Sequence, residues 1–471
     1  MATPLHVAML PWSAFGHLMP FFQLSIALAK SGVKVSFIST PKIIQRIPKP
    51  PPNLATLINL VEFPLPAFIG NALLPEGAEA TVDLPSFDKI QYLKIAYDLL
   101  QHPFKQFVAE QSPDWIFCDA LTHWAVKIAQ EYEVPLLHFS VFSASMYAFL
   151  GPDLLVDNKT KIRQSPESLT VVPEWVKFSS WLALRIFEAS GSFDGLYGLN
   201  ASGISDIDRA ANVLYGCQAI AIRSCPEYEG EYLNLFEKII GKPVIPVGLL
   251  TPENVNGRDQ ITDERWKKIF QWLDEQKPKS VVFVGFGSEC KLTRDQVYEM
   301  AYGLELSGLP FLWALRKPEW ASDDLDALPP GFGDRVHGKG MICIGWAPQL
   351  EILGHSSIGG SLFHAGWGSI IETLQFGHCL VVLPFIIDQP LNARVLVEKG
   401  LAVEVERSED GSFSRNEIAK ALTQAMVSEE GEKLRVKTRK ATMNFNNKKL
   451  QEDYFVRFVE YLKTNAVRKQ E

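Results

Sequence analysis

Short apolar runs alternate with helical spacing along the first half of the chain. The runs LHVAMLPW, VKVSFIST, DWIFCDA and PLLHFSV are typical of buried strands, and residues 17–30 and 124–131 carry helical patterns between them. This alternation predicts a parallel sheet covered by helices on both faces. The aromatic segment EWVKFSSWLALRIF at 174–187 is expected to be helical, with Trp175, Trp181 and Phe187 as its core stripe; a sugar-binding platform is the alternative.

The alternation stops in a proline-rich stretch and then starts again. PVIPVGLLTPENVNGRDQITDER has no periodicity from 251 to 263, which indicates an interdomain linker. SVVFVGFGS, FLWALRK, GMICIGW and CLVVLPF predict a second set of strands. Helices are expected at 368–376 and 389–400, with a capping box at Thr293 and Gln296 for another. The last 40 residues form one charged, amphipathic helical pattern.

We therefore predict an α/β protein of two doubly wound, Rossmann-like domains that face a cleft. The first domain spans 1–250 and a linker spans 251–264. The second domain spans 265–445, and a C-terminal helix at 446–471 packs back on the first domain. In open parallel sheets ligands bind at the carboxyl ends of the strands, so functional residues are expected just after strands.

Composition narrows the class of protein. The 471 residues are 47% hydrophobic and 21% charged with a net charge of −8, which excludes disordered, collagenous and coiled-coil chains. No block of like charge is present, so we expect no nucleic-acid partner. The longest apolar run, 379–387, is too short for a membrane span, which needs ~20 residues. No Lys or Arg precedes Lys30, so the N-terminus is interpreted as a strand and not as a signal peptide.

The six cysteines contain no CxxC pair, which argues against a zinc ribbon. We interpret them as reduced thiols of a cytoplasmic protein. Two Asp-x-Asp strings, at 206–208 and 324–326, could hold a metal in principle. Both lie in polar stretches, and we interpret them as solvated loops, so no metal site is expected.

His17 and Asp119 form a candidate catalytic pair. His17 follows the first predicted strand, where Gly16 allows a tight turn into a helix. A helix N-terminus disfavours imidazolium, so we expect His17 to be neutral near pH 7 and able to accept a proton from a hydroxyl. Asp119 ends another strand at the same edge and could orient the imidazole. The alternatives are a loop histidine and an aspartate that caps a helix starting at Ala120.

The segment 346–389 carries the strongest chemical signal. FHAGWGS combines a strand end, a glycine-rich turn and a helix start, which predicts an anion cradle. Trp346 could stack on a base, and Glu372 could accept both hydroxyls of a ribose. Asp388 and Gln389 suit the vicinal hydroxyls of a hexose.

This segment resembles the signature box of plant small-molecule UDP-glycosyltransferases. It has the opening WAPQ, the His-x-Gly-Trp-x-Ser core, Glu372 and the closing Asp-Gln, and the His17 loop, Asp119 and GFGSE also match. The resemblance implies the GT-B fold and metal-independent transfer of sugar with inversion, with a UDP-sugar as co-substrate and no cofactor. It implies that His17 is the base and Asp119 its partner. It also implies a UDP-sugar site made of Ser288, Trp346, Ala347, Gln349, His364, Trp367, Gly368, Ser369, Glu372, Asp388 and Gln389.

Within that site the resemblance gives each group of residues a part. Trp346 would stack on uracil with Gln349 near the base or ribose, and Glu372 would hold the ribose. Four residues of the signature box, together with Ser288, would surround the diphosphate. Three residues of the box would bind the sugar. The diphosphate residues of the box are His364, Trp367, Gly368 and Ser369, and the sugar residues are Trp367, Asp388 and Gln389.

Two departures from the family pattern bear on the acceptor. Position 368 is commonly Asn and is Gly here, and the position commonly held by Cys or Ser is Ala365. Gly368 together with Ser288-Glu289 resembles the branch that extends sugars already attached to natural products. We therefore expect a flavonoid, terpenoid or steroid glycoside as acceptor; a free aglycone is the alternative. Phe15, Phe142 and the stretch FPLPAFIGNALLP are candidates for the apolar wall.

UDP-glucose is the expected donor. Asp388 and Gln389 suit neutral hydroxyls, and 346–389 contains no Arg to pair with a uronic acid. UDP-rhamnose and UDP-xylose are alternatives. We expect a monomer. A non-catalytic nucleotide-sugar or glycoside binding protein is the competing class, but it would not need a His17–Asp119 pair.

Overall fold

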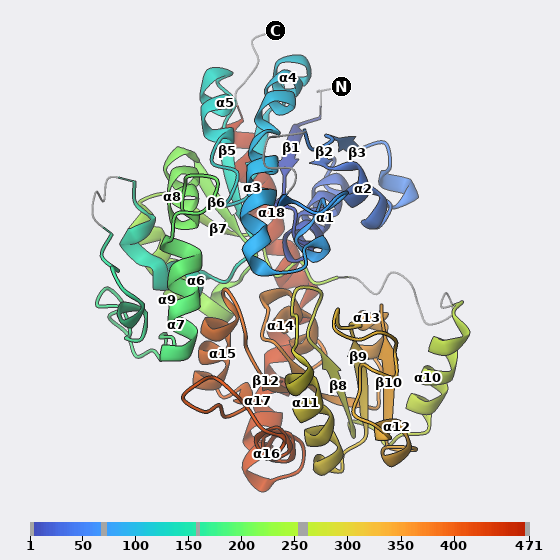
Figure 1. The fold of residues 1–471 in the computed structure, drawn as a ribbon. Helices are drawn as coiled ribbons and strands as arrows, with labels where there is room; N and C mark the ends of the chain where they lie inside the picture. The colour runs from blue at the N-terminus through green and yellow to red at the C-terminus, as the bar shows by residue number, and fades with distance from the viewer. Residues whose placement is uncertain (1–3, 67–72, 157–160, 253–261, 467–471) are drawn as a thin grey trace.

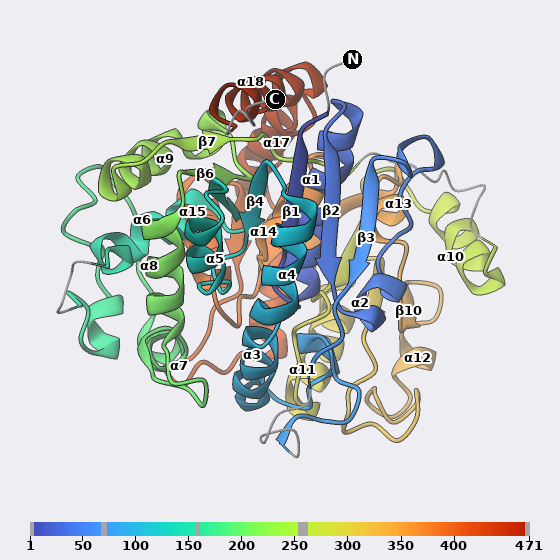
Figure 2. The same ribbon diagram turned by 90° about the horizontal axis from the view of Figure 1, so that it is seen from above.

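Two parallel sheets, one in each half of the chain, form the framework of the protein (Figure 1). The computed structural model describes residues 4–66, 73–156, 161–252 and 262–466. The first sheet has the order β3-β2-β1-β4-β5-β6-β7, and Figure 2 labels all of these strands except β5. Its strands are β1 (His6–Leu10), β2 (Lys34–Ser39), β3 (Ile58–Glu62), β4 (Trp115–Cys118), β5 (Leu136–Ser140), β6 (Ala219–Ile222) and β7 (Val244–Pro246).

The second sheet has the order β10-β9-β8-β11-β12-β13, and its strands are also parallel. Its strands are β8 (Val281–Gly285), β9 (Phe311–Leu315), β10 (Gly340–Ile344), β11 (Ile358–Phe363), β12 (Cys379–Val382) and β13 (Ala402–Glu404). Every residue of β1, β4, β5 and β6 is buried, as expected for a sheet covered on both faces. The predicted class, two doubly wound α/β halves, is confirmed.

Helices cover both sheets. Those of the first half are α1 (Phe15–Lys30), α2 (Pro41–Arg46), α3 (Ile90–Asp98), α4 (Gln101–Gln111), α5 (Ala125–Glu131), α6 (Ala144–Leu150), α7 (Ile186–Tyr197), α8 (Asp206–Gly216) and α9 (Pro226–Ile240). Those of the second are α10 (Glu264–Asp274), α11 (Arg294–Ser307), α12 (Phe332–Arg335), α13 (Gln349–Leu353), α14 (Trp367–Leu374), α15 (Gln389–Glu398), α16 (Arg415–Met426), α17 (Glu429–Phe445) and α18 (Lys448–Asn465). Thr293 and Gln296 form the expected capping box at α11.

The strand order reverses once in each sheet, between β1 and β4 and between β8 and β11. From β1 the chain runs outward through β2 and β3 and then returns to place β4 on the other side of β1. It does the same from β8 through β9 and β10 to β11. Loops that follow such neighbouring strands diverge and leave room for a ligand between them. The two switch points therefore mark where functional residues are expected.

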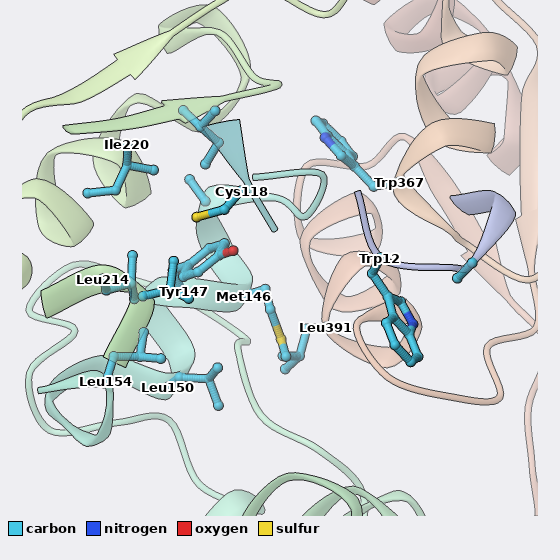
Figure 3. Packing of buried hydrophobic residues seen from close by; sticks show 14 of the residues in the cluster. Trp12, Cys118, Met146, Tyr147, Leu150, Leu154, Leu214, Ile220, Trp367 and Leu391 are labelled. Carbon is cyan, nitrogen blue, oxygen red and sulfur yellow. The ribbon is translucent and has the colours of Figure 1, made fainter. Parts of the chain in front are cut away.

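The two halves share a continuous apolar core (Figure 3). Trp12 and Tyr147 from the first half belong to the same buried cluster as Trp367 and Leu391 from the second. A buried ion pair adds to the contact, because Arg394 donates to both carboxylate oxygens of Glu188 at 3.0 and 2.8 Å. The halves are thus packed against each other and not merely tethered.

Helix α18 returns to the first half of the chain. Phe458 and Leu462 pack in the same cluster as Phe117, and the indole N–H of Trp115 donates to the Leu462 carbonyl at 3.1 Å. The prediction of one unbroken helical pattern over the last 40 residues is wrong. The chain breaks between α17 and α18, where the Asn447 side chain accepts the Leu450 N–H and starts a new helix.

The aromatic segment at 174–187 is also not the predicted helix. The chain is irregular up to Arg185, and α7 begins only at Ile186. Trp175 is held individually, since its indole N–H donates to the Ala148 carbonyl at 2.7 Å and its ring fills the place where Gly151 has no Cβ. The Trp181 side chain is 56% exposed, so these residues form no shared core stripe.

Several expectations concern surface and termini. Of the predicted linker 251–264, residues 253–261 lie outside the described residues, and α10 starts at Glu264. Within the described ranges, no helix is long and apolar enough to cross a membrane. All six cysteines are free thiols; five are buried and Cys290 is half-buried.

Candidate active site

The first switch point brings His17 and Asp119 together. Strands β1 and β4 are neighbours, with Leu10 opposite Cys118, so the loops that follow them meet. His17 lies in the first turn of α1, and its Nδ1 is 2.8 Å from Asp119 Oδ2. Because α5 begins only at Ala125, Asp119 caps no helix at Ala120, and that alternative is wrong.

Backbone groups fix the Asp119 carboxylate. The Trp12 N–H donates to Oδ2 at 3.1 Å and the Ala120 N–H donates to Oδ1 at 2.7 Å. Burial alone raises the pKa of Asp119, but His17 and the Trp12 N–H outweigh burial and lower it overall. The carboxylate is therefore held in its ionised form beside the imidazole.

The charge state of His17 differs from the sequence expectation. Burial lowers the pKa of His17, but attraction and hydrogen bonding to Asp119 outweigh it and raise the pKa above 6.5. The expected lowering by the helix N-terminus is wrong in direction, because a carboxylate at 2.8 Å outweighs the partial charges of a helix end. The Nδ1 contact leaves Nε2 available for a substrate. The Phe142 ring lies edge-on to the imidazole at 5.2 Å.

The second switch point holds a histidine in different surroundings. Strands β8 and β11 are neighbours, with Gly285 opposite Phe363, and the loops after them contain Gly287 and His364. A Cβ on Gly287 would lie 2.9 Å from the His364 imidazole, and one on Gly366 would lie 2.5 Å from it. Glycine is needed at both positions to leave room for the ring.

His364 has no carboxylate partner within the described part of the chain. Its Nδ1 is buried and makes no hydrogen bond to a described residue. Burial lowers the pKa of His364 to about 4, so the imidazole is neutral near pH 7. A neutral imidazole beside a helix N-terminus donates a hydrogen bond to an anion without carrying charge itself.

Helix α14 begins directly after His364. Gly366 is its N-cap, and the backbone N–H groups of the next three residues have no partner within the helix. Ala365 adopts φ of 62°, uncommon for a residue with a side chain, and its carbonyl accepts the Asn392 amide at 3.0 Å. The strand end, the tight turn and the helix start predicted for the anion cradle are therefore present, and its role stays a prediction. Gly368 and Ser369 lie in its first turn.

Two further groups extend from the cradle. Glu372 lies one turn into α14, where the Gln349 amide donates to its carboxylate at 2.6 Å. Burial raises the pKa of Glu372. Trp346 follows β10 and its side chain is 76% exposed, which leaves the ring face open for stacking. Ala347 is half-buried and packs on the α10 side of the second sheet.

Asp388 is the N-cap of α15, which follows β12, and Gln389 is the first residue of that helix. Asp388 is buried and accepts the Asn392 amide at 2.8 Å, and burial raises the pKa of Asp388 to about 6. The Gln389 side-chain oxygen accepts the N–H groups of Phe385 and Ile386 at 3.0 and 3.1 Å, so its amide nitrogen is the group left for a ligand.

The two switch points face each other. Asp388 and Glu289, both from the second half, lie close enough to His17 to raise its pKa. Glu289 in turn accepts the Thr81 hydroxyl at 2.8 Å, which joins its loop to the first half. The sugar-reading pair predicted at Asp388 and Gln389 thus borders the predicted base.

Known proteins resemble the whole chain. A family model described as "UDP-glucoronosyl and UDP-glucosyl transferase" matches residues 256–436. UDP-glycosyltransferase 91C1 of Arabidopsis thaliana is 42% identical over 97% of this chain and 95% of its own length. The chain belongs to the plant UDP-glycosyltransferases. It is therefore an enzyme, and the alternative of a non-catalytic binding protein is wrong.

Two more similarities extend this result. Soyasaponin III rhamnosyltransferase of Glycine max is 40% identical to this glycosyltransferase over 98% of this chain and 95% of its own length. The crystal structure of Glycyrrhiza uralensis UGT73P12, complexed with glycyrrhetinic acid 3-O-monoglucuronide, covers 98% of this chain and 96% of its own with a TM-score of 0.75 at 22% identity. That likeness confirms the GT-B fold.

Trp367 of the glycosyltransferase has a different position from the one its motif suggests. Its indole N–H donates to the Arg223 carbonyl at 2.7 Å, and its ring stacks on Tyr228 at 5.3 Å. The side chain is therefore buried between the two halves, and only the backbone of Trp367 is left for a ligand. Ser288 is exposed in the turn after β8, and its carbonyl accepts the Arg316 guanidinium.

Sequence reasoning missed Asn392 and Arg223. Asn392 bridges the halves, since it accepts the Ser143 hydroxyl at 2.8 Å and donates to Asp388 at 2.8 Å. Its spacing of four residues from Asp388 on a helix was the available signal. Arg223 directly follows β6, a four-residue strand that was not recognised, and a polar residue after a strand was the signal.

The apolar wall of the glycosyltransferase is described only in part. Phe142 contacts His17 edge-on, as given above, and Phe15 is half-buried at the start of α1. Residues 67–72 of the stretch FPLPAFIGNALLP lie outside the described residues.

The Asp-x-Asp strings show no convergence of metal ligands. Asp206 and Asp208 lie in the first turn of α8, so the loop interpretation is wrong for them. Asp206 pairs with Lys94 at 2.6 Å and Asp208 with Lys161 at 3.1 Å. Among the described residues, no group of three or more His, Cys, Asp or Glu side chains could hold a metal.

Proposed function

We propose that the enzyme transfers glucose from UDP-glucose, with inversion and without a metal ion, to a sugar hydroxyl of a small natural-product glycoside. The observation that carries this proposal is the buried His17–Asp119 pair, at 2.8 Å, facing Asp388 of the signature box. Acceptor binding is assigned to the first half, residues 1–250, and donor binding to residues 265–445.

The chemistry follows from the free nitrogen of His17. Nε2 takes the proton of the acceptor hydroxyl while its oxygen attacks the anomeric carbon. The bond from that carbon to the diphosphate oxygen breaks, and UDP leaves with the electron pair. Asp119 stabilises the imidazolium, and general-base assistance of this kind contributes ~10²–10⁴-fold. A single displacement inverts the anomeric centre.

The leaving group is stabilised by protein groups in this proposal. The N-terminus of α14 offers backbone N–H groups and the positive end of its dipole, and His364 adds a neutral donor. Uracil would stack on Trp346, and the ribose would bind Glu372 beside Gln349. Activity is therefore expected to survive EDTA, and loss in EDTA with recovery in Mn²⁺ would contradict the metal-free step.

The donor sugar is proposed from two side chains. Asp388 accepts and the Gln389 amide nitrogen donates, which suits neutral vicinal hydroxyls. The soybean relative is named a rhamnosyltransferase, so UDP-rhamnose is the second candidate donor. Measuring kcat/KM for UDP-glucose, UDP-rhamnose, UDP-xylose and UDP-glucuronate on one acceptor tests this. We expect UDP-glucose to lead, and a clear preference for another donor would refute the choice.

The acceptor is proposed from the polar groups around His17. Glu289 and Asp388 lie near the base and can accept hydrogen bonds from the neighbouring hydroxyls of a sugar. Burial raises the pKa of Glu289, which favours its use as a hydrogen-bonding group in a closed site. The soybean relative is named a soyasaponin III rhamnosyltransferase, and this name supports a glycoside as the acceptor.

Paired acceptors test the acceptor proposal. Flavonoid, terpenoid and steroid aglycones are assayed beside their monoglucosides, with product fragmentation by mass spectrometry. We expect a second sugar linked to the first. Efficient glucosylation of aglycones with the glycosides untouched would overturn the acceptor proposal and leave the donor proposal standing.

We further propose that the enzyme acts as a monomer in the cytoplasm. The six unbridged thiols support a reducing compartment. Size-exclusion chromatography with light scattering tests the oligomeric state, and a stable dimer at micromolar concentration would contradict it.

A further inference from the structure

Arg223 is a buried cation at the boundary between the two halves. It follows β6, and its side chain is only 2% exposed. Nε donates to the Leu249 carbonyl at 2.7 Å and Nη2 to the Leu250 carbonyl at 3.3 Å. Nη1 makes no hydrogen bond or ion pair to any described residue. The guanidinium is thus held by two of its three nitrogens, and Nη1 is the nitrogen left to donate to a further partner.

The unpaired nitrogen lies against the anion cradle. A Cβ on Gly368 would meet Arg223 Nη1 at 3.6 Å, and no other heavy atom outside its own neighbourhood lies within 4 Å of that position. Gly368 is the second residue of α14, in the turn whose N–H groups are free. A Cβ at this position would be in van der Waals contact with Nη1, so the glycine leaves the guanidinium next to the first turn of α14 with no side chain between them.

The surroundings keep the guanidinium charged and in place. Burial lowers the pKa of Arg223 to about 10, and the negative charge of Glu372 acts against this, so Arg223 is a cation at neutral pH. Glu372 makes no direct ion pair with it among the described contacts. The Arg223 carbonyl accepts the Trp367 indole N–H at 2.7 Å, which ties its backbone to the first residue of α14.

We propose that Arg223 is a donor-binding residue that reaches the diphosphate of the UDP-sugar from the first half of the protein, alongside Gly368. This inference rests on the proposed function, because it takes a nucleoside diphosphate as the ligand of the cradle. The guanidinium replaces the contact that an Asn at position 368 would make. It also adds positive charge where UDP leaves.

A purely structural role is the competing explanation. Two of the three guanidinium nitrogens hold the chain after β7, so removing Arg223 is also expected to lower stability. Ligands with and without phosphates separate the two roles, because uridine shares the base and ribose contacts with UDP and lacks the diphosphate. Calorimetry gives the Kd of UDP and of uridine for each variant, beside its melting temperature.

Arg223→Met removes the charge and keeps the length of the side chain. We expect the Kd of UDP to rise at least tenfold, as for loss of a hydrogen bond to a charged group, and that of uridine to change less than about twofold. Arg223→Lys keeps the charge and is expected to fall between Met and the wild type. Equal weakening of UDP and uridine would overturn the proposal and leave a structural role.

A substitution at Gly368 gives a second, independent test. Gly368→Asn in the Arg223→Met background restores a polar side chain beside the diphosphate and is expected to recover most of the UDP affinity. In the wild-type background it places a side chain 3.6 Å from Nη1 and is expected to gain little, so the two changes are non-additive. Additive effects of the two changes on the Kd of UDP would overturn the proposal. If Arg223→Met does not fold, Arg223→Lys replaces it in the same comparison with Gly368→Asn.

The wild-type measurements distinguish this inference from the proposed function. UDP binding and transfer in the wild type, with Arg223→Met binding UDP normally, would overturn only the role of Arg223. Failure of the wild type to bind UDP would overturn both.

Discussion

Each half of the protein places a histidine at its switch point, and the strand beside it decides what that histidine can do. In the first half the neighbouring strand β4 is followed directly by Asp119, which raises the pKa of His17. In the second half the neighbouring strand β8 leads to Gly287, and the unpartnered His364 has a pKa lowered to about 4. One topology thus places one histidine where its charged form is stabilised and another where it is neutral, as the proposed roles of base and hydrogen-bond donor require.

The difference matches two demands of sugar transfer. The acceptor hydroxyl must lose a proton, so it needs an imidazole whose charged form is stabilised. The diphosphate is already an anion and has no proton to lose, so it needs hydrogen-bond donors, and a neutral imidazole can be one of them. A carboxylate and a glycine at corresponding strand ends meet these demands.

Replacing each histidine by alanine should affect a different constant: kcat for His17 and the Kd of UDP for His364. His17→Ala is expected to lower kcat at saturation by ~10²-fold or more, with the Kd of UDP unchanged. His364→Ala is the matched variant, because it removes the same ring from the other switch point. It is expected to raise the Kd of UDP by about tenfold, as for one lost hydrogen bond to a charged group. Steady-state kinetics and calorimetry on both variants give the comparison.

If His17→Ala keeps more than roughly a tenth of kcat, the assignment of the base is wrong, because base removal should cost ~10²-fold. If both variants weaken UDP equally, the two switch points do not divide the work between them.

Removing the Asp119 carboxylate should lower the pKa of His17 toward that of His364. Asp119→Asn leaves the shape and removes the attraction that raises the pKa of His17, so burial then lowers that pKa. The rate falls at low pH because protonated His17 is no base, and the acid limb is expected to move to lower pH. The maximal rate is expected to drop by roughly tenfold, less than for His17→Ala. An acid limb that stays in place would show that another group controls it.

The sequence predicted much of this comparison because the relevant residues are local. His17 and Asp119 each follow an apolar run, and FHAGWGS contains its strand end, turn and helix start within seven letters. The doubly wound class follows from the same alternation. The spacing alone could not show that a carboxylate 2.8 Å away reverses the effect of the helix end on His17.

Contacts between the halves were beyond the sequence. Arg223 contacts Trp367 across 144 residues, and Asn392 contacts Ser143 across 249 residues, so these contacts exist only in the folded protein. The short strands β6 and β7 left too little periodic pattern to locate the residues that follow them. The break at Asn447 depends on one capping side chain within a long amphipathic pattern.

Asp388 allows a smaller test of where the two switch points meet. The pKa of its buried carboxyl is raised from 3.8 to about 6, so the fold disfavours the ionised form. That cost grows between pH 4 and pH 6 and is constant above. Asp388→Asn is therefore expected to stabilise the protein by on the order of 1–3 kcal/mol above pH 6, with little gain at pH 4, while lowering transfer. Denaturant unfolding at both pH values checks this, and an equal change at the two would contradict it.

The pKa values of the two histidines test the division of labour most directly. NMR titration of protein with labelled histidine, with His17→Gln and His364→Gln to assign the signals, measures both in one sample. We predict that His17 titrates above 6.5 and that His364 remains neutral down to about pH 4. A pKa for His17 at or below that of His364 would contradict the claim that the neighbouring strand end sets their roles.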